Sequence, residues 1–256
     1  MEFAGKVALI TGSSSGIGRV IAAELAKCGA AVSLHGRRQA DLDDSAALCL
    51  RQGLASDKIL TTVADVTAAG GVKTLFGATM EKFGRLDILI CNHGGTPKEG
   101  THVMASMEAV DYTMDVNYTS VVELCQLAVP ELVKTKGVVV MNSSIASGHF
   151  VLPMATYYSA AKAALDQYMR CMAVVYGPEG VRFNCVNPGA IDSGSLGKLG
   201  WTKETQDKAR NFCSSPFNFA FPHAKSQFIT GQTLVADGGF SLVKPIPQLE
   251  DIVKGT

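Results

Sequence analysis

Two residues four positions apart, Tyr158 and Lys162, could do acid–base chemistry from one face of a helix. A phenol has a pKa of about 10 and is a poor base at neutral pH. A cation about 4–6 Å away favours the phenolate and lowers that pKa by about 1–3 units. Tyr158 could then exchange a proton with the oxygen of an alcohol or a carbonyl compound. This spacing is also found in many ordinary helices, so the interpretation needs a second motif.

The second motif is the glycine-rich segment Thr11–Gly18, which reads TGSSSGIG between an apolar run and a helical pattern. Gly12 suits a tight turn, Gly16 lets backbone N–H groups approach a pyrophosphate, and Gly18 allows close packing of the helix on the strand. The helix N-terminus adds partial positive charge. The segment therefore predicts a dinucleotide site. Its expected cofactor-binding residues are Gly12, Ser14, Ser15, Gly16, Ile17 and Gly18.

The elements that must position these residues alternate along the chain. Short apolar runs without alternation predict buried strands at 6–11, 31–35, 59–63, 87–91, 138–142, 181–186 and 233–235. Helical spacing predicts helices at 16–28, 41–51, 68–83, 107–133 and 156–176. Strands buried on both faces are typical of parallel sheets. We therefore expect an α/β fold: a single Rossmann-like domain over 1–256, with a doubly wound parallel sheet of about seven strands and helices on both faces.

Composition excludes several other classes of protein. The chain has 256 residues, of which 47% are hydrophobic and 18% charged, so it can bury a core and is not disordered. With 23 basic and 23 acidic residues the net charge is zero, which argues against a nucleic-acid partner. No apolar run is long enough to span a membrane, and the N-terminus does not resemble a secretory signal. The seven cysteines form no CxxC pair. We expect reduced thiols, no metal site and a cytoplasmic location.

Taken together, the motifs resemble the short-chain dehydrogenase/reductase family in its classical type. The resemblance runs from Lys6 to about Ser193 and resumes at 229–239. Beyond the two motifs above, the residues that carry it are Asp65-Val66, Cys91-Asn92-His93-Gly94, Asn117, Ser144, and Pro188, Gly189, Ile191 and Ser193. Cys91, His93 and Ser193 depart from the usual family residues.

The resemblance implies four catalytic residues. Tyr158 would be the general acid in reduction and the base in oxidation, and Lys162 would lower its pKa and bond the nicotinamide ribose. Ser144 would orient the substrate oxygen, with Ser143 as the alternative because the spacing to the tyrosine is one residue longer than usual. Asn117 would hold a water that links Lys162 to solvent.

The resemblance also implies further contacts to the cofactor. Asp65 would contact the adenine, with Val66 beside it. Asn92 and Gly94 would belong to the same site. Pro188, Gly189 and Ile191 would line the nicotinamide side, and Ser193 would bond the carboxamide. The protein would supply placement and charge, while the hydride belongs to the cofactor.

The end of the predicted strand 31–35 bears on the choice of cofactor. An NAD site usually carries an acid there to bond the ribose 2′-hydroxyl. This chain has Gly36 at that position, followed by Arg37 and Arg38. A guanidinium is suited to a 2′-phosphate. We therefore expect NADP(H) rather than NAD(H), with Arg37 as the main contact and Arg38 as the secondary one. The alternative is a pair of solvated surface arginines.

His93 stands where the family has a small residue. It could sense pH or contact substrate. The favoured interpretation is that it packs against the backbone with a satisfied nitrogen.

The region 194–228 is shorter than the family pattern. It has room for about one of the two helices expected there, a substrate lid that includes Trp201. The second helix, before 228–231, is missing through either a deletion or a real variation. Phe217, Phe219 and Phe221 could fill the gap it leaves.

The resemblance implies an NADP(H)-dependent oxidoreductase that interconverts a carbonyl and a secondary alcohol, acting as a homodimer or homotetramer. The alternative is a cofactor-binding protein with little or no activity, because the lid region is short. Phe150, Leu152, Met154 and Trp201 favour an apolar small-molecule substrate, although they could equally belong to the core.

Overall fold

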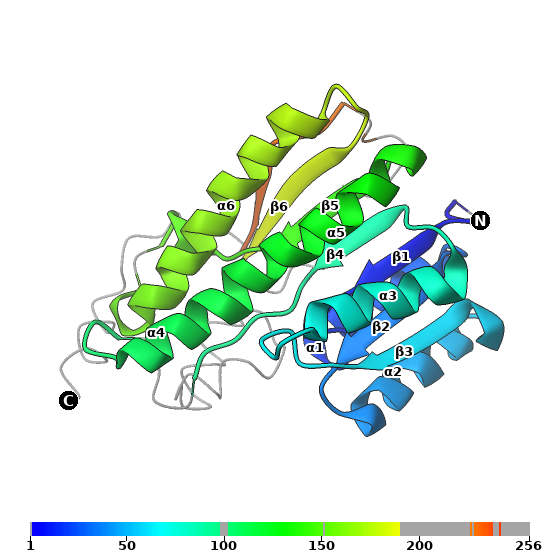
Figure 1. Cartoon of the computed structure of the whole chain (residues 1–256), viewed down its shortest axis with the longest axis horizontal. Helices are drawn as coiled ribbons and strands as arrows, with labels where there is room; N and C mark the ends of the chain where they lie inside the picture. The colour runs from blue at the N-terminus through cyan, green and yellow to red at the C-terminus, as the bar shows by residue number, and fades with distance from the viewer. Residues whose placement is uncertain are drawn as a thin grey trace.

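The structure, a computed structural model, describes residues 2–97, 102–150, 152–189, 226, 228–237 and 241. Its seven strands form one parallel sheet in the order β3-β2-β1-β4-β5-β6-β7 (Figure 1). The strands are β1 (Val7–Ile10), β2 (Ala31–Gly36), β3 (Ile59–Val63), β4 (Ile88–Cys91), β5 (Val138–Asn142), β6 (Arg182–Pro188) and β7 (Thr233–Ala236). The predicted parallel sheet is confirmed.

Helices cover both faces of the sheet, as the sequence predicts (Figure 1). One face packs against α1 (Gly16–Lys27) and α2 (Gln39–Arg51). The other packs against α3 (Gly71–Phe83), α5 (Ser120–Thr135) and α6 (Thr156–Tyr176). The strand order reverses between β1 and β4, so the loops at their carboxyl ends diverge. Such a switch point is where α/β sheets bind ligands.

The predicted continuous helix at 107–133 is wrong in its middle. The chain forms α4 (Met107–Met114), a π-helical turn (Asp115–Thr119) and then α5. Within the turn, the Asn117 side chain donates to the carbonyl of Thr113 at 2.8 Å and to that of Gly95 at 2.7 Å. A side chain that bonds back into the helix and to a neighbouring loop can stabilise such a bulge, which local periodicity does not reveal.

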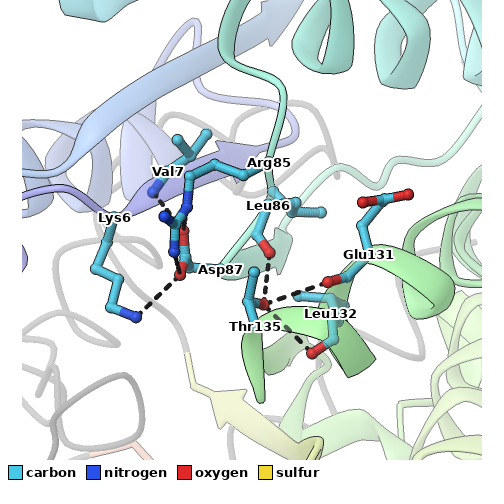
Figure 2. A network of polar contacts seen from close by, with 8 residues as sticks. All are labelled: Lys6, Val7, Arg85, Leu86, Asp87, Glu131, Leu132 and Thr135. Carbon is cyan, nitrogen blue, oxygen red and sulfur yellow. Dashed lines mark hydrogen bonds and ion pairs between the residues drawn. The ribbon is translucent and has the colours of Figure 1, made fainter.

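The amino ends of the strands are held together around Asp87, on the edge of the sheet opposite to the switch point (Figure 2). Its carboxylate accepts from Val7 N at 3.0 Å, from Lys6 Nζ at 3.0 Å and from Arg85 Nε and Nη2 at 2.8 and 2.7 Å. Burial opposes ionisation of Asp87, but these hydrogen bonds outweigh it and hold its pKa below the usual value. Close by, Thr135 at the end of α5 donates to the Leu86 carbonyl at 2.7 Å.

Some expectations fall outside the described residues, namely those for Ile191, Ser193, Trp201 and most of 194–228. The six cysteines that the structure describes are all free thiols. Within the same described ranges, none of the helices combines the length and apolar character needed to cross a bilayer.

Candidate active site

The glycine-rich loop joins β1 to α1 at the switch point, and its glycines are required by shape. Gly12 has φ +62°, in the left-handed region. A Cβ on Gly18 would lie 2.4 Å from the Gly12 carbonyl oxygen. At the start of α1, the first turn holds no acid and the N-cap Ser15 makes no side-chain capping hydrogen bond. Backbone N–H groups and the positive end of the helix therefore face the loop, which fits a pyrophosphate.

His35 supports this loop, a role that the sequence did not suggest. Its Nδ1 accepts from Gly12 N at 3.1 Å, so the proton lies on Nε2, which donates to the Ala64 carbonyl at 3.2 Å. The His35 backbone also exchanges hydrogen bonds with Ser13. Burial lowers the pKa of His35 and keeps the ring neutral. The sequence does show a histidine at the end of a predicted strand. The direction of its side chain, however, depends on how β2 is aligned with the loop, which the sequence does not reveal.

Gly36 ends β2 where it faces the loop. A Cβ there would lie 2.7 Å from the Ser14 Cβ, so the position has no room for an acidic side chain unless the loop moves. Arg37 and Arg38 follow, both exposed, and Arg38 forms an ion pair with Asp41. The structure thus leaves Arg37 as the less engaged of the two predicted contacts.

Arg19 is a third arginine in this corner, which sequence reasoning missed. Its Nε donates to Ser45 Oγ at 2.9 Å, and its Nη2 donates to the carbonyls of Ser14 and Asp41. It therefore joins the loop to the first turn of α2. The sequence feature that could have indicated this role is an arginine in the first turn of the helix that follows the glycine-rich loop.

Asp65 and Val66 follow β3 at the same edge. Asp65 Oδ1 accepts from the Thr67 backbone N at 2.9 Å and from its hydroxyl at 2.7 Å, which lowers the pKa of Asp65. Val66 is buried in the core. Asp65 itself is exposed, and its contact with adenine stays a prediction.

Asn92 connects three strands of the sheet. Its Nδ2 donates to the carbonyls of Thr11 and Gly12, both at 3.0 Å, and its Oδ1 accepts from Asn142 Nδ2 at 2.9 Å. Gly94 then passes close to the side chains of Asn117 and Lys162. A Cβ on Gly94 would lie 2.7 Å from Asn117 Oδ1 and 3.4 Å from Lys162 Nζ. The segment from Asn92 to Gly94 therefore joins the glycine-rich loop to Asn117 and Lys162.

His93 is buried, and both of its ring nitrogens have a hydrogen-bond partner. Its Nδ1 lies 2.6 Å from the Thr11 hydroxyl, and its Nε2 lies 2.9 Å from the Ser120 hydroxyl. The Thr11 oxygen already accepts from the backbone N–H groups of Asn92 and His93, so Nδ1 has to accept and Nε2 carries the proton. Burial lowers the pKa of His93 to about 3. This agrees with the packing interpretation rather than with sensing of physiological pH.

Tyr158 and Lys162 lie one turn apart on α6, and Lys162 Nζ is 5.7 Å from the centre of the Tyr158 ring. Lys162 is buried and donates to the Asn142 carbonyl at 2.9 Å. Burial lowers the pKa of Lys162 to about 8. The sequence predicts a lowered pKa for Tyr158, whereas burial raises it here and a hydrogen bond with Ser144 opposes that rise. The expected lowering of the Tyr158 pKa is therefore not found in this structure.

The two candidate serines have different partners. Ser144 bonds the Tyr158 side chain and accepts from Ala146 N at 3.2 Å. Ser143 is buried, and its hydroxyl donates to the Lys162 carbonyl at 3.3 Å. The geometry therefore favours Ser144 over Ser143.

Asn117 lies beside Lys162, but its amide is engaged. Besides its two donated bonds, its Oδ1 accepts from Gly95 N at 3.1 Å. A water that links Asn117 to Lys162 stays a prediction. At the end of β6, Pro188 is buried and Gly189 N donates to the Ala236 carbonyl at 3.2 Å, so both lie at the carboxyl edge of the sheet.

The fold and this cluster define a dinucleotide-binding α/β protein with a Tyr–Lys–Ser site. Comparison with known proteins agrees, because the family model "short chain dehydrogenase" matches residues 6–204. The chain therefore belongs to the short-chain dehydrogenase/reductase family. It is an oxidoreductase of the class that acts on alcohols and carbonyls, with the nicotinamide cofactor binding typical of that family.

Three relatives show how far the similarity extends. The 11-beta-hydroxysteroid dehydrogenase A of Sesamum indicum is 35% identical over 192 residues, which cover 75% of this chain and 54% of that protein. The cyclohexanol dehydrogenase of Rhodococcus is 34% identical, with 93% of this chain and 96% of that one covered. A Caenorhabditis elegans short-chain dehydrogenase/reductase of unknown function, crystallised with cofactor, superimposes with a TM-score of 0.87 at 32% identity and covers 95% of this chain and 98% of that one.

Proposed function

We propose that the protein interconverts a carbonyl and a secondary alcohol with NADP(H), and that Tyr158 delivers or removes the proton. The observation that carries the proposal is that Tyr158 lies next to both Lys162 and Ser144. The segment Asn92–Gly94 links this group of side chains to the glycine-rich loop. Bound there, the cofactor supplies or accepts the hydride.

The chain's own residues then have separate tasks. Tyr158, protonated because burial raises its pKa, donates its proton to the substrate oxygen in reduction. Ser144 bonds the phenol and would share the substrate oxygen with it. Lys162 lies next to the Tyr158 ring and can take up the proton of Tyr158 or return it. Its pKa of about 8 lies close to physiological pH, so both forms of the amine are available.

The preference for NADP(H) is supported by charge and by shape at the end of β2. Arg37 and Arg38 are exposed there, and Gly36 has no room for the acid of an NAD site. Arg19 lies in the same corner, but its guanidinium is engaged by the Ser14 and Asp41 carbonyls and by the Asp44 carboxylate. Asp41 partly neutralises Arg38, so Arg37 is the main proposed contact to a 2′-phosphate.

The proposed substrate is an apolar secondary alcohol or the matching ketone. Two relatives carry the names of a hydroxysteroid dehydrogenase and a cyclohexanol dehydrogenase, which supports an apolar cyclic compound. Phe150 and Leu152 are partly exposed near Ser144 in the sequence, as lining residues would be. A homodimer or homotetramer and a cytoplasmic location stay predictions from the sequence.

The test measures the absorbance of NADPH at 340 nm with cyclohexanone and a panel of larger cyclic ketones. Tyr158→Phe should lower turnover by about 10²–10⁴-fold and leave cofactor binding intact. Tyr157→Phe is the matched control, because it loses only the hydroxyl that donates to the Val103 carbonyl at 3.2 Å. Cofactor-dependent thermal stabilisation without turnover in the wild type would instead support the alternative, a binding protein with little activity.

A further inference from the structure

Asp166 is a buried acid on α6, one turn beyond Lys162, and the mechanism above does not use it. It is 5% exposed. Its Oδ2 accepts from Ser147 Oγ at 2.6 Å and from Asn187 Nδ2 at 3.0 Å, and Asn187 Nδ2 also donates to Ser147 Oγ at 2.8 Å. A carboxylate with two donors in a buried triangle of this kind is a specific arrangement, because a buried charge without partners is costly.

The triangle joins the three segments that carry the proposed active site. Ser147 closes the short 3-10 helix that begins directly after Ser144. Asn187 is the residue before Pro188, near the end of β6. Asp166 lies on the helix of Tyr158 and Lys162. A shift of any one segment relative to the other two would break a hydrogen bond to the same oxygen.

Asp166 is also the counter-charge of Lys162. Residues four apart on a helix are neighbours, and Asp166 acts electrostatically on Lys162. Within the part of the chain that the structure describes, the other titratable groups near Lys162 are uncharged at neutral pH. A hydrogen bond with the Cys125 thiol, together with burial, raises the pKa of Cys91 on β4. Burial and the nearby Asp166 carboxylate raise the pKa of Cys185 on β6. Burial raises the pKa of Tyr158 on α6 and lowers that of His93 after β4.

We propose that Asp166 is a positioning residue of the active site, whose carboxylate fixes the segments of Ser144 and Pro188 against α6 and places an acidic group one turn from Lys162. The proposal rests on the proposed function for its chemical meaning. The effect of Asp166 on Lys162 exists in the folded protein without substrate, so it can be measured in the absence of any reaction. Arg170, exposed on the next turn of α6, is a further charged group near Cys185.

The test is a titration of Lys162 in the full-length protein by NMR of labelled lysine side chains, with Lys162→Met to assign the signal. In Asp166→Asn the amide oxygen can still accept from Ser147 and Asn187, so this variant removes the charge and keeps the shape. We expect the pKa of Lys162 to fall by about one unit or more. Asp57→Asn is the control, because Asp57 is exposed on the 3-10 helix before β3 at the opposite edge of the sheet. It should leave the pKa unchanged.

A pKa of Lys162 that is the same in wild type and Asp166→Asn would overturn the proposal, as would an equal fall in Asp57→Asn. Should Asp166→Asn not fold, Asp166→Ser is a second neutral variant with the same expected and refuting results. With cyclohexanol as the probe, the pH profile of kcat/KM should move to lower pH by the same amount. Absence of turnover in the wild type would count against the proposed function, while the NMR titration would still decide the role of Asp166.

Discussion

Replacing Gly36 by alanine should weaken dinucleotide binding through shape alone. The new methyl would lie 2.7 Å from the Ser14 Cβ and 2.9 Å from its Oγ. Ordinary contact between carbon atoms is at about 3.5–4.0 Å, so the loop has to move by about 1 Å. Overpacking of this size costs about 1–3 kcal/mol. If the loop returns to its position when the pyrophosphate binds, the Kd rises by about 5- to 140-fold.

Fluorescence titration with NADPH and with NADH measures this effect, and urea unfolding checks that the variant is folded. Both cofactors should lose affinity by a similar factor, because the clash is within the protein. The double variant Ser14→Gly/Gly36→Ala removes both crowded atoms and should bind as tightly as Ser14→Gly alone. Wild-type affinity in Gly36→Ala, or a loss that persists unchanged in the double variant, would refute the reasoning.

Two further predictions concern groups that hold the sheet and the loop. Asp87→Ala should lower the free energy of unfolding in urea by about 2–3 kcal/mol, because it leaves the buried Val7 N–H unpaired, while the partly exposed Lys6 and Arg85 return to water. In the wild type, the contribution of Asp87 to the free energy of unfolding should disappear as pH falls through the lowered pKa of Asp87. A loss below about 0.5 kcal/mol in Asp87→Ala would contradict this account. Dinucleotide affinity should fall as pH drops through the lowered pKa of His35, because the protonated ring cannot accept from Gly12 N–H. Titration between pH 5 and 8 should show no such dependence in His35→Gln, and equal dependence in both proteins would disprove the role.

Most of the fold could be predicted because the sequence signals are local. Strands such as β1 and β4 are continuous apolar runs, buried along their whole length. Helix α6 begins and ends where the periodicity from Thr156 to Tyr176 places it. The π-helical turn at Asp115–Thr119 escaped prediction, since its cause is a tertiary one. Asn117 bonds Gly95, which is 22 residues away in the sequence.

The candidate site was predictable where spacing along one element sets the geometry. Tyr158 and Lys162 share a helix face at any register, so their contact follows from the sequence. Asp166 and His35 gave no such signal, because their partners come from other elements. Asn187 meets Asp166 across β6 and α6, and Gly12 meets His35 across two strands. Only the packed sheet and helices bring those atoms together.

The raised pKa of Tyr158, where the sequence predicts a lowered one, bears on the direction of the proposed reaction. Burial keeps the proton on the phenol, and reduction of a carbonyl needs a donor that holds a proton. Oxidation needs that proton to leave, and Lys162, with a pKa of about 8, is the adjacent group that can pass it on. Because Lys162 loses its charge above that pH, alkaline conditions favour removal of the proton and neutral conditions favour its delivery. If Asp166 stabilises the charged form of Lys162 as proposed, it would set the pH at which reduction gives way to oxidation.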